Sequence, residues 1–135
     1  RREAVRLLDM VGLACRPETP LLGLRSSEQQ LVEIARALSV NARVLIMDEP
    51  TAALGVQETA RVEEIVKGLK QRGVPLIIIS HNLRQVFDLV DRIWVFRQGR
   101  IICSRPKHLT NPEEIVGLIT GAIDPASLRA ENGAQ

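Results

Sequence analysis

The chain has 135 residues, of which 45% are hydrophobic and 25% charged, enough apolar content to bury the core of one ordinary domain. A net charge of +2, one Trp and two Phe offer too little basic surface and too few stacking side chains to favour nucleic acid as a partner. No apolar run approaches the roughly 20 residues of a membrane-spanning helix, and Cys15 and Cys103 stand apart without a CxxC pair, which favours reduced thiols and a cytosolic location.

Two helices are predicted in the first 40 residues. Val5, Leu8 and Val11 have helical spacing from the outset, so the chain is expected to be cut at its start, in mid-helix. After two prolines, the next helix is predicted to begin near Ser27, where Ser-Glu-Gln-Gln has the form of a capping box. The apolar face of this helix would consist of Leu31, Ile34, Ala35 and Leu38.

The middle of the chain predicts a strand, a helix and a second strand. VLIM, residues 44–47, is an unbroken apolar run of the kind found in parallel strands that are covered on both faces. Residues 56–72 return to helical spacing, and Gly73 supplies the stop before the apolar strand PLIIIS. This order predicts a βαβ unit. The buried face of its helix would consist of Val62, Ile65, Val66 and Leu69.

The last third of the chain predicts short elements. A fourth helix is expected over residues 83–90, and RIWVFRQGRIIC has the pattern of a hairpin turned at Gln98 and Gly99. Asn111, followed by Pro and by Glu three residues on, is expected to cap a last short helix. The final segment, ASLRAENGAQ, is polar enough to be disordered.

Acidic side chains and a histidine follow the two buried strands. Asp48 and Glu49 end the first strand and His81 ends the second, at the edge of an open α/β sheet where ligands bind. One carboxylate suits a magnesium ion bound to nucleotide phosphates, its neighbour can orient or deprotonate a water, and an imidazole can hydrogen-bond a terminal phosphate. From spacing alone, a solvated turn and a structural histidine stay open as alternatives.

Three stretches together resemble the ATP-binding-cassette (ABC) ATPases. EQQLVEIARAL resembles their signature helix, VLIMDEPTAAL their Walker B strand with its catalytic Glu, and SHNLRQVFDLVDRIWVFRQGRI the segment of their switch histidine. The resemblance implies a partial α/β core of the P-loop NTPase type, with a βαβ unit, a hairpin and part of the helical subdomain. Residues 1–121 would form a partial nucleotide-binding domain, with the helical subdomain in 1–40, the core in 41–105 and a polar tail in 122–135.

The resemblance also implies roles for single residues. Asp48 would support magnesium through a water, Glu49 would polarise the hydrolytic water, and His81 would contact the γ-phosphate. Ser26 and Ser27 lie where the signature loop binds ATP.

The implied function is that of an ATP-binding and ATP-hydrolysing subunit of an importer. VEIA at 32–35 and the run ARVLIMDEPTAAL further resemble ribose- and xylose-type sugar importers. ATP and magnesium would be the cofactors. A second cassette and a transmembrane permease would be the partners, at the cytoplasmic face of the cell membrane.

The chain departs from the family pattern at the phosphate loop, at the signature loop and in the loop after Glu49, where Ala52 and Gly55 replace the usual Ser and Asp. It has no GxxxxGK[ST], the loop whose amides and lysine cradle phosphates, so it is expected to be a carboxyl-terminal piece of a cassette that does not hydrolyse ATP by itself. LSGGQ falls on residues 24–28, where only Leu24 matches, and Glu28 is expected to stabilise the helix while weakening phosphate binding. The alternatives are an inactive fragment that acts as an interaction surface and a piece of a soluble ABC ATPase without a transport role.

Overall fold

The computed structural model describes residues 2–40 and 42–131, and it divides into two compact units, Arg1–His81 and Asn82–Gln135. The boundary falls directly after the predicted switch histidine, inside the range 41–105 that the sequence assigned to one core. Residues 1, 41 and 132–135, at which several predicted ranges begin or end, lie outside the described part. None of the helices in the described part combines the length and the apolar character needed to cross a membrane.

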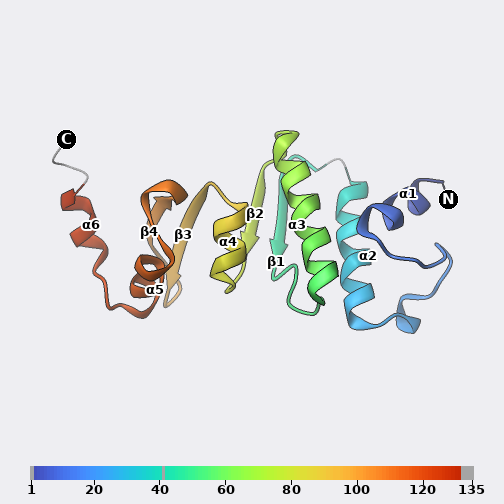
Figure 1. Cartoon of the computed structure of the whole chain (residues 1–135), viewed down its shortest axis with the longest axis horizontal. Coiled ribbons are helices and arrows are strands. Elements are labelled where there is room, and N and C mark those ends of the chain that lie inside the picture. Colours follow the sequence, from blue (N-terminus) through green and yellow to red (C-terminus); the bar gives the residue numbers. More distant parts are fainter. Residues whose placement is uncertain (1, 41, 132–135) are drawn as a thin grey trace. The chain divides into compact units, whose positions relative to one another are not determined.

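The first unit contains the predicted βαβ arrangement, preceded by two helices (Figure 1). Its elements are α1 (Arg2–Val11), the 3₁₀ turn η1 (Leu21–Gly23), α2 (Ser26–Ser39), β1 (Leu45–Asp48), α3 (Val56–Gln71) and β2 (Leu76–Ile79). The strands β1 and β2 are parallel, with Asp48 opposite Ile79. Gly73 has a φ of 75°, so the predicted stop after α3 is confirmed as a residue in the left-handed conformation that glycine adopts without strain.

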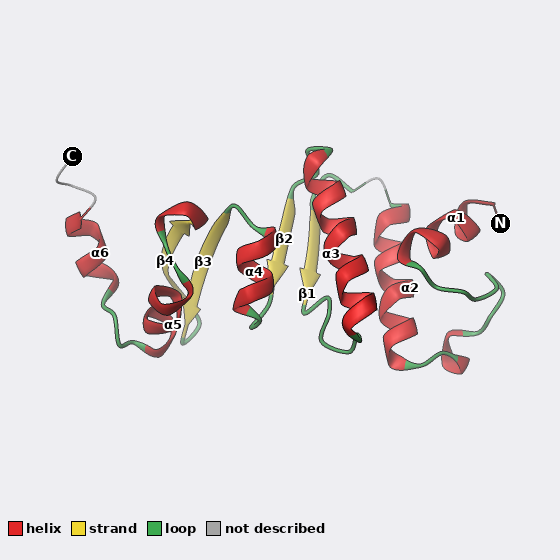
Figure 2. Ribbon diagram, viewed as in Figure 1, coloured by secondary structure: helices red, strands yellow, loops and turns green. Residues whose placement is uncertain are grey.

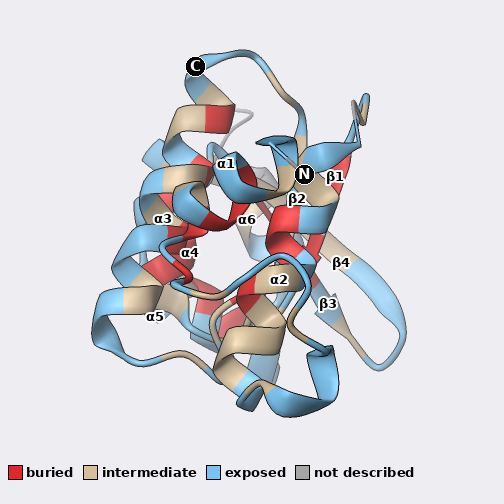
Figure 3. Cartoon of the chain, turned by 90° about the vertical axis from the view of Figure 1, so that its right-hand side faces the viewer, coloured by how far each residue is buried: buried red, intermediate tan, exposed pale blue. Residues whose placement is uncertain are grey.

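One face of each helix in this unit is buried and the opposite face is exposed (Figure 3). The predicted apolar faces of α2 and α3 are buried at most positions, but Val5 of α1 is 44% exposed, because Leu7 takes the buried side of that helix. The buried residues of the unit are aliphatic: Leu7, Leu8, Val11, Leu13, Leu31, Ile34, Ala35, Leu45, Met47, Val62, Val66 and Leu69.

The two-stranded sheet is covered on one face only. Burial alternates along β1, where Met47 is buried and Ile46 is 63% exposed, and Ile77 and Ile79 of β2 are each 51% exposed. The prediction that VLIM is covered on both faces is therefore wrong for the described chain. An apolar run favours a strand through the shape of its side chains, but burial depends on what packs against each face.

The second unit combines a hairpin with short helices (Figure 2). Its elements are α4 (Leu83–Leu89), β3 (Arg92–Arg97), β4 (Arg100–Pro106), the 3₁₀ turn η2 (Lys107–Leu109), α5 (Pro112–Thr120) and α6 (Pro125–Glu131). The predicted hairpin turn is confirmed, since Gln98 and Gly99 have φ values of 50° and 74°, as a two-residue turn with two left-handed residues requires. The predicted cap is also confirmed, because the Asn111 side chain accepts a hydrogen bond from the Glu114 backbone N–H at 2.8 Å.

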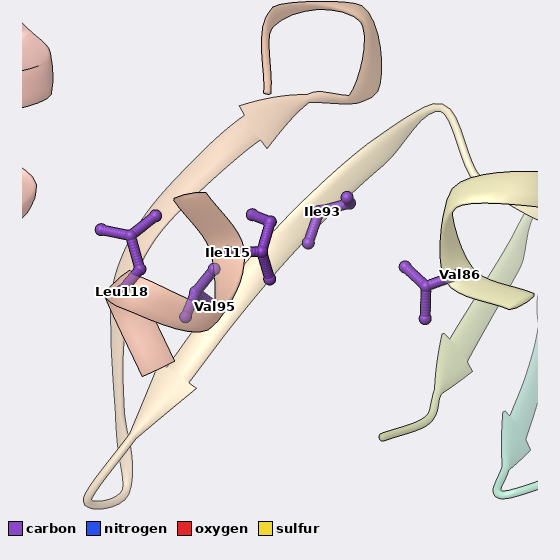
Figure 4. Close-up of a cluster of buried hydrophobic side chains, with 5 residues drawn as sticks. All are labelled: Val86, Ile93, Val95, Ile115 and Leu118. Atoms are coloured by element: carbon purple, nitrogen blue, oxygen red, sulfur yellow. The ribbon is translucent and has the colours of Figure 1, made fainter. Parts of the chain in front are cut away.

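The core of the second unit is a small aliphatic cluster. Figure 4 shows its five buried side chains, which come from α4, β3 and α5: Val86, Ile93, Val95, Ile115 and Leu118.

The carboxyl-terminal segment also contributes to this cluster. The prediction of disorder is wrong for its first part, because residues 125–131 form α6 and Leu128 packs against the cluster. Asp124, directly before α6, supports the start of that helix by accepting a hydrogen bond from the Ala126 backbone N–H at 2.9 Å.

Substitution of Leu118 by Ala tests the weight of this cluster. Leu118 is fully buried, at 0% exposure, so we expect Leu118→Ala to lower the free energy of unfolding of the second unit by about 2–5 kcal/mol. The matched control is Val116→Ala on the same helix, where Val116 is 47% exposed, and we expect it to change stability by less than about 0.5 kcal/mol. Denaturant titration followed by the fluorescence of Trp94 measures both, and equal effects would contradict the assigned core.

Candidate active site

Glu49 and His81 are in contact at the carboxyl edge of the parallel sheet. Nδ1 of His81 lies 2.8 Å from Oε1 of Glu49, and the backbone N–H of His81 donates to the same oxygen at 3.1 Å. Because β1 ends at Asp48, opposite Ile79 of β2, the residues that follow both strands meet. The structure thus brings together the two residues predicted to be catalytic, and their catalytic roles stay a prediction.

The backbone of Glu49 is unusual. Its φ is 46°, in the left-handed region that residues other than glycine seldom adopt. Its N–H donates to the Ile79 carbonyl at 2.8 Å, and its carbonyl accepts from the Ala52 N–H at 3.2 Å and from Nε2 of Gln30 at 2.9 Å. Such a conformation persists where surrounding contacts determine it.

Gln30 is the residue of this site that sequence reasoning missed. In the sequence it belongs to a capping pattern and to the stretch that resembles the signature helix, without a predicted role of its own. Its partner Glu49 lies 19 residues away, so no local pattern could have indicated the contact. Its Oε1 also accepts a hydrogen bond from the Ala53 backbone N–H at 3.3 Å. One side-chain amide therefore joins α2 to both sides of the loop that follows β1.

The histidine and the two carboxylates of the site lie near the protein surface. The side chain of His81 is 84% exposed and that of Glu49 is 36% exposed, so solvent screens the attraction between them, and their geometry matters more than their charge. Asp48 is exposed at the end of β1. The described residues hold no cluster of three or more His, Cys, Asp or Glu side chains able to bind a metal alone. The exposed carboxylate of Asp48 is of the type that supports a magnesium ion held mainly by phosphates and waters, and this role stays a prediction.

Ser26 and Ser27 are the first two residues of α2, so this helix begins one residue earlier than predicted. The predicted capping box on Ser27 is wrong. The residue before the helix is Arg25, whose backbone N–H donates to Oε2 of Glu28 at 2.8 Å, while its Nη2 donates to Oε1 at 3.0 Å. A glutamate at the third helical position can accept a hydrogen bond from the backbone N–H of the residue before the helix, even where that residue is not a serine or threonine. These bonds confirm that Glu28 supports the helix, and its predicted cost to phosphate binding stays a prediction.

Known proteins of one family share this fold and sequence. The model of the ABC transporter family matches residues 1–52. A dimeric ATP-binding cassette in a post-hydrolysis state, bound to ADP and Pi, matches with a TM-score of 0.72 at 25% identity, over 78% of this chain and 46% of that chain. A putative metal-chelate-type ABC transporter matches with a TM-score of 0.73 at 20% identity, over 89% and 48%, a likeness of fold alone. The chain thus has the sequence and fold of part of the nucleotide-binding domain of ABC transporters.

Within this family the chain is similar to sugar-import proteins. A ribose import ATP-binding protein of Rubrobacter xylanophilus is 43% identical over 121 residues, 90% of this chain and 23% of that protein. A xylose import ATP-binding protein of Thermoanaerobacter pseudethanolicus is 42% identical over 119 residues, 88% of this chain and 24% of that protein. The predicted resemblance to sugar importers is confirmed. The chain spans about a quarter of the length of these relatives.

The contact between Arg25 and Glu28 predicts a pH dependence. The hydrogen bonds from Arg25 lower the pKa of Glu28 below its usual value, so the stability that this carboxylate contributes is present above the unfolded pKa, about 4.3, and is lost as the pH falls through the lower folded value. We expect Glu28→Gln to melt at a lower temperature than the wild type at pH 7, and the difference to shrink between about pH 5 and pH 3. Thermal melts monitored by circular dichroism test this, and a difference that grows on acidification would contradict it.

Proposed function

We propose that this chain supplies the water-orienting and phosphate-sensing part of the ATPase subunit of an ABC importer for a sugar. The observation that carries the proposal is the 2.8 Å contact between Glu49 and His81 at the carboxyl edge of the sheet. The similarity of the chain to ribose and xylose import ATP-binding proteins supports a sugar as the transported substrate.

Glu49 acts on the attacking water in this proposal. A carboxylate can accept a hydrogen bond from a water molecule and take its proton as the oxygen attacks phosphorus. Both bonds from His81 engage Oε1, so Oε2 is the oxygen that these two bonds leave for the water. The contacts on the backbone of Glu49 hold the carboxylate before substrate arrives, which lowers the entropic cost of orienting it.

His81 senses the terminal phosphate. An ionised carboxylate only accepts hydrogen bonds, so Nδ1 of His81 carries the proton in its contact with Glu49. The other ring nitrogen, Nε2, then accepts in the neutral ring and donates in the protonated ring. A contact with a phosphate oxygen, which is an acceptor, therefore calls for the protonated ring, whose positive charge offsets the negative charge that develops on the phosphate.

The remaining residues bind rather than react. Asp48 would support magnesium through a water, and Ser26 and Ser27 would offer their hydroxyl and backbone N–H groups at the amino end of α2 to a phosphate of ATP. Magnesium, when bound, neutralises charge on the phosphate oxygens. The dimeric ATP-binding cassette among the similar structures supports a second cassette as partner. The import proteins support a transmembrane permease as the other partner, with the subunit at the cytoplasmic face of the membrane.

Substitution of the two contacting residues tests the assignment. In a complete cassette that includes these residues, we expect Glu49→Gln to keep ATP binding and to slow hydrolysis by about 10²–10⁴-fold, because a positioned acid–base group is typically worth that much. His81→Ala should also impair hydrolysis more than binding. The control is Glu64→Gln on the exposed side of α3, which should leave both unchanged. Near-normal turnover by Glu49→Gln would refute its role, and equal losses of binding and turnover in His81→Ala would mark His81 as structural.

The 135 residues alone test whether this part of the cassette can bind and hydrolyse ATP by itself. They include no GxxxxGK[ST] sequence, whose backbone amides and lysine would offset the repulsion between an anionic ligand and the carboxylates of Asp48 and Glu49. We expect isothermal titration with magnesium and ATP at millimolar concentrations to show no saturable binding, and we expect no hydrolysis above background. Saturable binding by this chain would show that its site is sufficient by itself.

A further inference from the structure

The amide of Gln30 makes two hydrogen bonds that cross from α2 to the loop after β1. Its Nε2 donates to the Glu49 carbonyl at 2.9 Å, and its Oε1 accepts from the Ala53 N–H at 3.3 Å. Gln30 is partly buried, so water competes less for these bonds than it would at an exposed site.

The Glu49 carbonyl is a point where such a contact matters. Glu49 combines a φ of 46° with a proline at the next position, and proline restricts the residue before it to extended conformations. The left-handed backbone of Glu49 is therefore unfavourable on both counts and depends on the groups that bind its peptide. This backbone also sets the direction of the side chain, and hence the 2.8 Å contact with His81.

We propose that Gln30 is a positioning residue, through which α2 holds Glu49 in the conformation that directs its carboxylate to His81. Ser26 and Ser27 precede Gln30 by four and three residues, so all three lie on neighbouring positions of one helix face. A ligand that shifts the start of α2 would then shift Glu49 through the same amide. This second step rests on the proposed function, whereas the link between Gln30 and Glu49 does not.

Gln29 provides a matched control. It is the same residue type on the same helical turn, and its Nε2 donates to the Leu21 carbonyl at 3.0 Å and to the Leu24 carbonyl at 2.9 Å, both in the segment before the helix. Substitution of Gln29 thus removes a side-chain amide from α2 and leaves the bond from Gln30 to the Glu49 carbonyl in place.

Nuclear magnetic resonance of the 135-residue chain tests the link without any nucleotide. We expect Gln30→Met and Gln30→Glu to change the Nδ1 resonance of His81 and the amide resonance of Glu49, and Gln29→Met to leave both in place. Gln30→Glu keeps an oxygen for the Ala53 N–H but loses the donor to the Glu49 carbonyl, so it separates the two bonds.

Three results would overturn the proposal. In the first, the resonances stay unchanged in both Gln30 variants. In the second, they change in Gln30→Met alone, which would assign the effect to the bond with the Ala53 N–H. In the third, Gln30→Glu loses its helices by circular dichroism, which would mark Gln30 as structural.

Kinetics in a complete cassette provide the second readout. We expect Gln30→Glu to lower kcat for ATP hydrolysis by about 10- to 100-fold, since a misplaced catalytic group costs about that much, with KM for ATP within about twofold of the wild type. A parallel rise in KM or an unchanged kcat would count against positioning. If the wild type hydrolyses no ATP, the proposed function fails, and the resonances of His81 and Glu49 still decide the link.

Discussion

The parallel pairing of β1 with β2 is the constraint on which the candidate site depends. Parallel neighbours need a crossover connection, and α3 supplies it between the two strands. With Asp48 opposite Ile79, Glu49 follows one strand and His81 lies two residues beyond the other. A register slip of one residue would move one strand by about 3.3 Å and turn its side chains to the opposite face, which would end the contact between Glu49 and His81. The site is therefore a product of register.

Glu49 lies where the strand ends and the turn begins. Its N–H extends the ladder to Ile79, and its carbonyl accepts from Ala52 in the turn. The left-handed conformation allows one residue to take part in both, at a cost of about 1–3 kcal/mol that the surrounding structure must offset. Local strain of this kind is concentrated at functional sites, which agrees with the role proposed for Glu49.

Local patterns predicted most of the fold, because their physical causes are local. The helical spacing in α2 and α3, the cap at Asn111 and the turn at Gln98 and Gly99 each depend on a few neighbouring residues, and the structure confirms them. The order of strand, helix and strand was sufficient to bring Glu49 and His81 to one edge of the sheet.

The missed features depend on contacts between distant segments or on competing local choices. Gln30 is a polar residue in a helix, and nothing near it in the sequence indicates a carbonyl 19 residues away. At the start of α2, the hydrogen bond between Glu28 and the Arg25 backbone N–H forms in place of a serine cap. At the carboxyl end, the polar composition of the segment predicted disorder and did not indicate that Leu128 packs against the cluster. The exposed faces of Ile46 and Ile77 reflect what packs beside them rather than their own sequence.

The two units differ in their near-ultraviolet absorption and fluorescence. Phe87, Trp94 and Phe96 are the only aromatic residues of the sequence, and all three belong to the second unit. The first unit, which includes Glu49 and His81, thus absorbs and emits almost nothing in the near ultraviolet. Intrinsic tryptophan fluorescence therefore arises from Trp94 in the hairpin of the second unit. A single tryptophan introduced on an exposed position of α3 would make the first unit visible without disturbing its aliphatic core.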